Sequence, residues 1–247
     1  LYGQRGDLVH ALRAHNTTIA NEPSEPNGID KCFTLLNFGA MAEAKRCAAN
    51  LASLYPQSKG QAQLQAALAG FEGDFTTALS LMDLENQIQA WNNAAVLQLN
   101  GRSEQALSIY QKLVPELFVQ PPVPGTSLYP GDTVAVGAAL ISTGAVKQAQ
   151  QVLRMGIKDA AALPLAGHLG RRWSEVYAYA LLAEYGNACE ALAEAADKGY
   201  FHNYLQLAVD PELAELRQQP CFEKQYGRIR AQAEAQVIAA RKAGLLP

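Results

Sequence analysis

Residues that could perform acid–base, nucleophilic or metal chemistry are scattered through this sequence rather than grouped. The histidines are His10, His15, His168 and His202, and no His-Glu-x-x-His or Cys-x-x-Cys motif accompanies them. No glycine-rich phosphate loop occurs either. Hydrolysis or group transfer needs a nucleophile beside a base, paired carboxylates or metal ligands. The pattern therefore predicts a non-enzymatic protein with no catalytic residue, no metal and no cofactor.

The cysteines leave two interpretations open. Cys32 and Cys47 flank a turn at Gly39, one on each helix of a predicted hairpin, and could face each other. Cys189 and Cys221 fall in different predicted helices. Four cysteines in 247 residues are too few for a disulfide-stapled scaffold. Buried thiols are the simpler expectation, with Cys32–Cys47 as the candidate disulfide.

A helical hairpin is predicted at residues 91–115. Apolar residues recur there at helical spacing on both sides of the Asn100-Gly101 turn, which indicates two antiparallel amphipathic helices. Such a hairpin cannot bury its apolar face alone, so similar hairpins should stack against it.

Similar hairpins are found by aligning on a turn glycine that is followed five residues later by alanine. The pairs are Gly39 with Ala44, Gly73 with Ala78, Gly101 with Ala106, Gly144 with Ala149, and Gly186 with Ala191. This pattern resembles the tetratricopeptide repeat, and the first spacing, 34 residues, is the length of that repeat. The later spacings of 28, 43 and 42 residues indicate degenerate repeats. Gly137 matches the small residue that lets the two helices of a repeat approach closely.

The predicted fold is therefore all-α. The resemblance implies a right-handed superhelix of antiparallel hairpins, a tetratricopeptide-like α-solenoid. We expect residues 1–118 to hold an N-terminal helix (1–20) and three hairpins, residues 119–131 a proline-rich loop, and residues 132–247 two hairpins and capping helices. The loop could be a hinge between two halves, but one continuous solenoid is the preferred prediction, because the repeats on either side of the loop both need neighbours.

A long amphipathic helix is predicted from about Phe222 to Gly244. Its apolar stripe consists of Phe222, Tyr226, Ile229, Ala233, Val237 and Ala240. Its other face carries Lys224, Arg228, Arg230, Glu234, Arg241 and Lys242. A helix of this kind can cover the last repeat while facing water, so it is predicted to be a capping helix. Before it, Asp210 is a strong N-cap and Pro211 a natural first helical residue.

The same region carries a second resemblance. Its marks are Gly199-Tyr200, Asn203-Tyr204, Asp210-Pro211, Leu213, Leu216-Arg217, Pro220 and Phe222. These resemble the C-terminal signature of repeat domains in CadC-like, ToxR-type membrane-bound transcription regulators and in some class III adenylate cyclases. Residues 218–222 depart from that signature, which has charged residues around the proline. The resemblance implies that catalytic or DNA-binding functions lie in another part of such proteins.

Composition excludes several classes of function. The net charge is −3 and no long basic run occurs, so no nucleic-acid partner is predicted for this region. No apolar window approaches the roughly 18 residues of a membrane span. The chain begins at Leu1 in helix-like sequence, which suggests a piece of a longer protein; a membrane would be reached only through a missing N-terminal segment.

The binding surface implied by the repeat is the concave groove, lined by the first helix of each hairpin. Transferring the repeat's groove positions selects an apolar and amide-rich set without lysine or arginine: Phe33, Asn37, Gln63, Phe71, Trp91, Gln98, Val134, Ser142, Trp173 and Val176. Without cations the groove cannot clamp an acidic peptide tail. It suits a protein or extended peptide, a small apolar ligand, or another element of the same chain. An aromatic residue at helical spacing is more often part of the hydrophobic core than in contact with a ligand. Trp91 and Trp173 could therefore be core residues instead.

Two classes of function follow from these patterns. The preferred one is the periplasmic sensor or effector domain of an inner-membrane transcription regulator, monomeric or forming a homodimer. The alternative is a cytoplasmic protein–protein interaction scaffold, or the regulatory tail of a multidomain enzyme such as an adenylate cyclase. Repeat folds serve many functions, so the fold alone does not decide between them.

Overall fold

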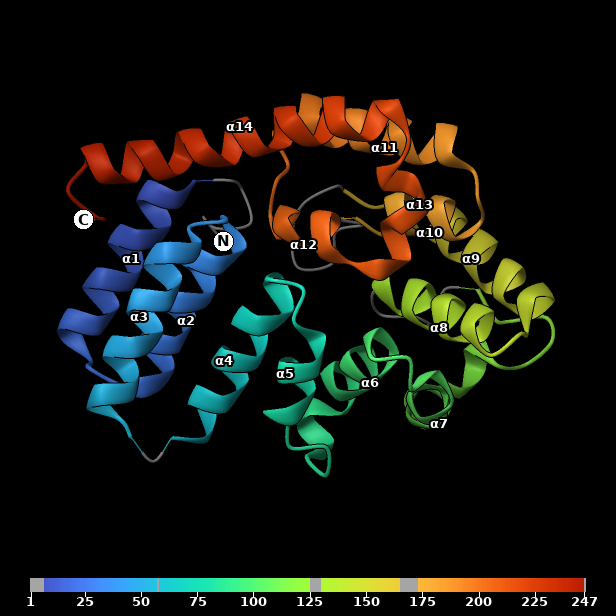
Figure 1. The fold of residues 1–247 in the computed structure, drawn as a ribbon, viewed down its shortest axis with the longest axis horizontal. Coiled ribbons are helices and arrows are strands. Elements are labelled where there is room, and N and C mark those ends of the chain that lie inside the picture. The colour runs from blue at the N-terminus through green and yellow to red at the C-terminus, as the bar shows by residue number, and fades with distance from the viewer. Residues whose placement is uncertain (1–6, 57, 125–129, 165–172, 247) are drawn as a thin grey trace. The chain divides into compact units, whose positions relative to one another are not determined.

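The computed structural model describes residues 7–56, 58–124, 130–164 and 173–246, and all regular structure in these ranges is helical (Figure 1). The α-helices are α1 (Leu8–Asn21), α2 (Glu25–Asn37), α3 (Met41–Leu54), α4 (Lys59–Phe71), α5 (Phe75–Ser80), α6 (Ala90–Leu99), α7 (Ser103–Leu113), α8 (Pro130–Ser142), α9 (Val146–Ala160), α10 (Ser174–Leu181), α11 (Tyr185–Asp197), α12 (Tyr204–Val209), α13 (Ala214–Arg217) and α14 (Pro220–Lys242). Short 3₁₀ helices are η2 (Gln87–Gln89), η3 (Pro115–Leu117) and η4 (Pro211–Leu213). The prediction of an all-α fold is confirmed for the described residues.

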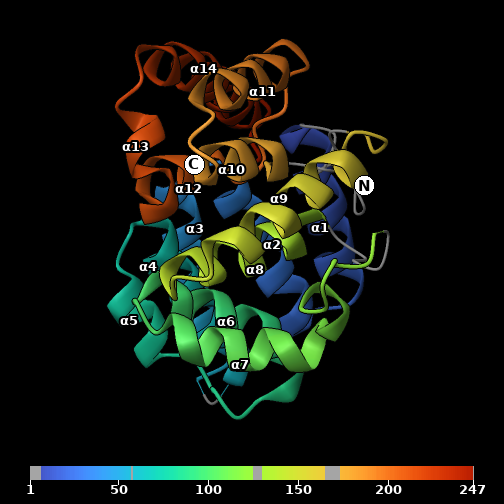
Figure 2. The same ribbon diagram turned by 90° about the vertical axis from the view of Figure 1, so that its right-hand side faces the viewer.

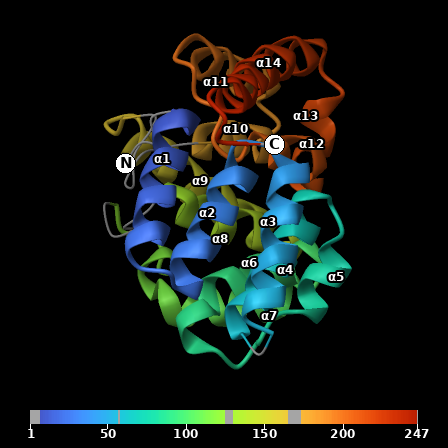
Figure 3. The same ribbon diagram turned by 90° about the vertical axis from the view of Figure 1, so that its left-hand side faces the viewer.

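The chain forms two compact units. Unit 1 comprises residues 1–82, 195–209 and 226–247, and unit 2 comprises residues 83–194 and 210–225. Within unit 1, α1, α2 and α3 lie side by side (Figure 3). Within unit 2, α6 packs on α7 and α8 packs on α9 (Figure 2). Each unit therefore contains sequential hairpins together with part of the C-terminal region.

Five hairpin turns share one hydrogen-bonding pattern. In each, a residue with positive φ ends the first helix, and the next N–H donates to the carbonyl oxygen five residues earlier, as Ala40 does to Leu35 at 2.9 Å. This is the Schellman arrangement, which satisfies carbonyl groups left open at a helix end. The turn residues are Gly39 (φ 75°), Gly73 (φ 82°), Gly101 (φ 73°), Gly144 (φ 86°) and Ala183 (φ 58°).

The fifth turn corrects the repeat alignment. Gly186 lies inside α11 and does not form the turn. The turn residue is Ala183, because Glu184 N–H donates to the carbonyl oxygen of Tyr179 at 2.8 Å. The alanine five residues after this turn is therefore Ala188, and the predicted partner Ala191 is only half-buried.

With this correction, one position is strictly shared by all hairpins. The residue five places after the turn is an alanine with at most 1% of its surface exposed: Ala44, Ala78, Ala106, Ala149 and Ala188. In the α8–α9 hairpin, Ala149 lies on α9 and a second small residue, Gly137, lies on α8. A Cβ added to Gly137 would lie 2.5 Å from Leu153 Cδ2, so only glycine fits at this close approach. Small residues on both sides let the two helix backbones approach, which is the packing expected for this repeat pattern.

The stripe predicted for the last helix is confirmed. Phe222, Tyr226, Ile229, Ala233, Val237 and Ala240 are all buried on α14, and the predicted charged face is exposed. In unit 1, Gln232 Nε2 donates to the carbonyl oxygen of Ala196 at 2.7 Å, so α14 contacts the end of α11 as a cap would. None of the helices within the described ranges is both long and apolar enough to cross a bilayer.

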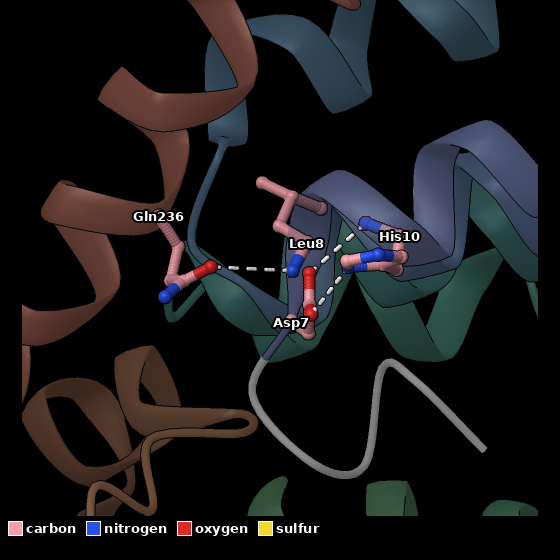
Figure 4. Close-up of polar contacts among 4 residues, drawn as sticks. All are labelled: Asp7, Leu8, His10 and Gln236. Carbon is pink, nitrogen blue, oxygen red and sulfur yellow. Dashed lines mark hydrogen bonds and ion pairs between the residues drawn. The ribbon is translucent and has the colours of Figure 1, made fainter. Parts of the chain in front are cut away.

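The N-terminal helix α1 has a defined N-cap. Its first residue is Leu8, and Asp7 is its N-cap, accepting a hydrogen bond from the N–H of His10 at 3.0 Å (Figure 4). The N–H of Leu8 donates to Gln236 Oε1 of α14 at 3.3 Å, also within unit 1. Residues 1–6 of the predicted helix lie outside the described residues.

The turn at Gly39 provides a first test of this packing. We expect Gly39→Ala to destabilise the protein by about 1–3 kcal/mol more than Gly101→Ala. Both substitutions place alanine at a positive φ, but a Cβ at residue 39 would lie 2.5 Å from Tyr204 Cε1, whereas residue 101 has no atom within 4 Å. Urea denaturation of the two variants measures the difference; equal losses would mean that Tyr204 moves aside without cost.

Candidate functional site

The residues predicted to line the groove fall into three classes of exposure. Gln63 and Ser142 are exposed, and Phe33, Asn37 and Trp91 are half-buried. The others are buried, namely Phe71, Gln98, Val134, Trp173 and Val176. Val134 belongs to an apolar cluster with Leu153 and Ala178. The buried apolar members therefore serve as core in this structure, and the open part of the predicted surface is smaller than the full set.

The chain's own C-terminal region contacts two of these positions, Asn37 and Gln98. In unit 1, the N–H of Asn203 donates to the carbonyl oxygen of Asn37 at 2.9 Å, and the adjacent Phe38 packs edge-on against Phe201 with ring centroids 5.4 Å apart. In unit 2, Gln98 Nε2 donates to Glu212 Oε1. At Asn37 and Gln98, therefore, the residue in contact comes from another element of the same chain, which is one of the occupants considered for the groove.

The contact at Gln98 belongs to a polar cluster in unit 2, which is the candidate site. We call it the Asp210–Glu212 cluster; it consists of Gln98 (α6), Tyr110 (α7), Tyr177 (α10), Asp210, Glu212 (η4) and Arg217 (α13). Asp210 caps η4, because its Oδ1 accepts the N–H of Glu212 at 2.9 Å. Its Oδ2 accepts the hydroxyl of Tyr177 at 2.9 Å, and Arg217 Nη1 donates to its carbonyl oxygen at 2.6 Å.

The two carboxyl groups of the cluster are in unequal environments. Burial raises the pKa of Asp210, but the Glu212 N–H, the Tyr177 hydroxyl and the charge of Arg217 oppose this rise. Burial and the charge of Asp210 raise the pKa of Glu212 to about 8, and only the amide of Gln98 opposes them. Burial therefore raises the pKa of both carboxyl groups, and Glu212 has fewer hydrogen bonds and charges that oppose the rise than Asp210 has.

Two buried polar atoms beside these carboxyl groups have no hydrogen-bond partner among the described residues. They are Gln98 Oε1 and the hydroxyl oxygen of Tyr110. Burial, followed by the charges of Glu212 and Asp132, raises the pKa of Tyr110, so its hydroxyl stays protonated. Trp91 packs on Tyr110 with ring centroids 4.8 Å apart. Trp91 thus supports this cluster from a half-buried position rather than standing free in a groove.

The chemistry available to the cluster is proton uptake and hydrogen bonding. A carboxyl group with a pKa near 8 exchanges its proton in the physiological range. Three or more histidine, cysteine, aspartate or glutamate side chains placed to hold a metal ion are not found among the described residues.

Sequence reasoning selected Gln98 and recognised Asp210 as a helix cap, but it missed Tyr177 and Glu212. The one signal for Tyr177 is a register position that it shares with Phe33 alone among the selected residues. Tyr177 lies six residues before the turn at Ala183, as Phe33 lies six residues before Gly39, and Phe33 was selected for the groove. Aligning on Gly186 instead placed Tyr177 at the wrong position. Nothing in the local sequence around Glu212 distinguishes it from an exposed helix glutamate.

The cysteines are paired, which corrects the expectation of buried thiols. Cys32 is bonded to Cys47 across the α2–α3 hairpin, with Cα atoms 5.5 Å apart. Cys189 of α11 is bonded to Cys221 of α14, with Cα atoms 6.0 Å apart, and no cysteine is free. The first pair is the candidate disulfide; the second was not distinguished from the other pairings by spacing.

The chain was compared with known protein families and with curated proteins. A scan against protein-family models finds no match to the chain, and a search of curated proteins finds none that is similar.

Proposed function

We propose that the five hairpins are tetratricopeptide-like repeats of a right-handed α-solenoid. The support is the shared turn geometry and the buried alanine five residues after each turn. Those features meet the packing requirement of a stacked helical hairpin, in which two helices cross closely at small residues.

We further propose that the chain is a non-enzymatic binding domain that acts outside the cytoplasm, as the sensor or effector part of a membrane-bound bacterial transcription regulator. The observation that carries this proposal is the pairing of all four cysteines. Structural disulfides persist in oxidising compartments such as the periplasm and are rare in the cytosol. The C-terminal resemblance to CadC-like regulators points to the same compartment.

The proposed partner is a protein, a peptide or a small ligand bound at the exposed members of the predicted repeat surface. Gln63 and Ser142 are the exposed members of the predicted surface, and Phe33 is half-buried. Their amide, hydroxyl and aromatic groups suit neutral ligands better than charged ones. A homodimer that uses these positions remains part of the proposal.

The compartment can be tested with reporter fusions. The gene, with all coding sequence upstream of Leu1, is fused after Pro247 to alkaline phosphatase, which is active only where disulfides form, and in parallel to β-galactosidase, which is active in the cytoplasm. We expect high phosphatase and low galactosidase activity. We also expect the upstream sequence to encode about 20 consecutive apolar residues preceded by a basic winged-helix region.

The control is thiol trapping in the same cells. Acid quenching and alkylation should leave all four cysteines unmodified until a reductant is added. An active galactosidase fusion together with freely alkylated cysteines would refute the sensor proposal and favour the cytoplasmic scaffold. Turnover of a substrate by the pure protein would refute the non-enzymatic assignment.

A further inference from the structure

Unit 1 contains a cavity that no part of the proposed function uses. Its volume is about 390 Å³, which lies within the range of small-molecule sites. Its walls are formed by α1, α2, α3 and the end of the chain, and its aliphatic lining is Ile19, Leu35, Leu51, Leu54, Leu245 and Leu246. The predicted groove residues do not line it, so this site is separate from the repeat surface and does not depend on the proposed function.

The cavity is aliphatic but positively charged. Lys31, Glu43 and Arg46 are its charged lining residues. Glu43 is buried and is bonded by two arginines, Arg46 at 3.3 Å and Arg241 at 2.6 Å. Burial raises the pKa of Glu43, but hydrogen bonds from Arg241 and from the backbone N–H of Glu43, together with the charges of Arg241 and Arg46, outweigh burial and lower the pKa, so this carboxylate stays charged. The two arginines thus neutralise the negative charge of Glu43, so Glu43 does not also balance the positive charge of Lys31.

Lys31 is the cation that remains. Lys31 is half-buried, and no carboxylate is bonded to its side chain among the described residues. Burial alone lowers the pKa of Lys31, and no neighbouring acid opposes that shift. An incompletely hydrated ammonium group in an aliphatic cavity gains most from a single anionic partner that brings its own apolar surface.

We propose that this cavity binds an aliphatic monocarboxylate, whose carboxylate pairs with Lys31 and whose hydrocarbon chain lies against the leucine walls. A monoanion matches Lys31, which has no acidic partner among the residues that the structure describes, whereas a phosphate dianion would need the arginines that Glu43 already occupies. Leu54 lines the cavity and has 70% of its surface exposed, so it forms part of the entrance, where the end of the ligand's hydrocarbon chain would leave the cavity.

Isothermal titration calorimetry on the complete chain with decanoate, decanol and decylamine tests the proposal. Decanoate is expected to bind at least about tenfold more tightly than decanol or decylamine, because only the carboxylate forms a charge-assisted hydrogen bond. Lys31→Met keeps the aliphatic stem and removes the charge. It should weaken decanoate about tenfold or more and leave decanol unchanged.

Two further variants separate the parts of the site. Leu54→Ser should weaken decanoate and decanol equally, since it shortens the apolar wall without touching the charge. Lys45→Met is the matched control, because Lys45 is an exposed lysine of α3 paired with Glu72 and does not line the cavity; it should change neither affinity.

The proposal is overturned if decanoate does not bind, or if it binds wild type and Lys31→Met alike. Equal affinities of wild type for decanoate and decanol would also overturn it, and this comparison remains decisive if the lysine variant fails to fold. Circular dichroism of each variant identifies that case.

Discussion

Replacing Glu212 by glutamine is expected to make the protein more stable at pH 8 and to reduce the loss of stability that the wild type shows between about pH 5 and pH 8. In the folded protein Glu212 keeps its proton up to a pKa of about 8. In the unfolded chain it loses the proton near its ordinary pKa of about 4.3. Between these values the unfolded state binds fewer protons, so the free energy of unfolding falls as the pH rises.

The size of this effect follows from the shift. Each pKa unit corresponds to about 1.4 kcal/mol, so the substitution is expected to stabilise the protein at pH 8 by a few kcal/mol. Glutamine is nearly isosteric, and its side-chain oxygen can still accept the hydrogen bond that Gln98 donates to Glu212. The measurement is urea denaturation at pH 5, 6, 7 and 8.

Glu215→Gln provides the control, because Glu215 is an exposed glutamate of the neighbouring helix α13. It makes the same change of carboxyl group to amide at an exposed position and should leave the pH profile of the wild type unchanged. Identical profiles for Glu212→Gln and wild type would show that Glu212 is ionised in the folded protein, contrary to its burial beside Asp210.

Removing either disulfide is expected to cost several kcal/mol. The Cys32–Cys47 bond closes a sequence separation of 15 residues and the Cys189–Cys221 bond one of 32 residues. The loop-closure entropy of the unfolded chain predicts losses of about 3 and about 4 kcal/mol for the two double alanine variants. Alanine suits these positions, since Cys32 is fully buried and Cys189 nearly so.

Reductant supplies the internal control for this prediction. Dithiothreitol should lower the free energy of unfolding of the wild type by about the sum of the two losses. In each double variant it should lower the free energy of unfolding only by the contribution of the one disulfide that remains. Variants as stable as the oxidised wild type would show that the disulfides do not restrict the unfolded chain. They would also weaken the argument for an oxidising compartment.

Local features of this chain followed from its sequence. The alternation of apolar and charged residues on α14 placed six side chains on the buried face, because helical periodicity is a property of consecutive residues. The four turns at glycine were found for a similar reason, since glycine adopts positive φ without steric cost. These features are decided within one or two helical turns of chain.

The fifth turn shows where residue type misled the prediction. Alanine at positive φ costs only about 1–2 kcal/mol, which the hydrogen bond from Glu184 to Tyr179 and the packing of Ala188 can offset. Because the alignment of the hairpins required a glycine in the turn, it placed the fifth turn at Gly186, three residues after the true turn residue Ala183. The error displaced Tyr177 from the site, even though Trp173 remained among the selected residues.

Sequence by itself determined the helices, the hairpins and four of the five close-packed alanines of this protein, because each depends on residues near one another in the chain. Only the tertiary structure decided the candidate site, the second disulfide and the aliphatic cavity. Gln98 and Glu212 are 114 residues apart and meet because η4 packs against α10 in the same unit as α6. The raised pKa of Glu212 and the lowered pKa of Lys31 arise from burial and, for Glu212, from the charge of Asp210, and no local pattern of residues encodes either shift.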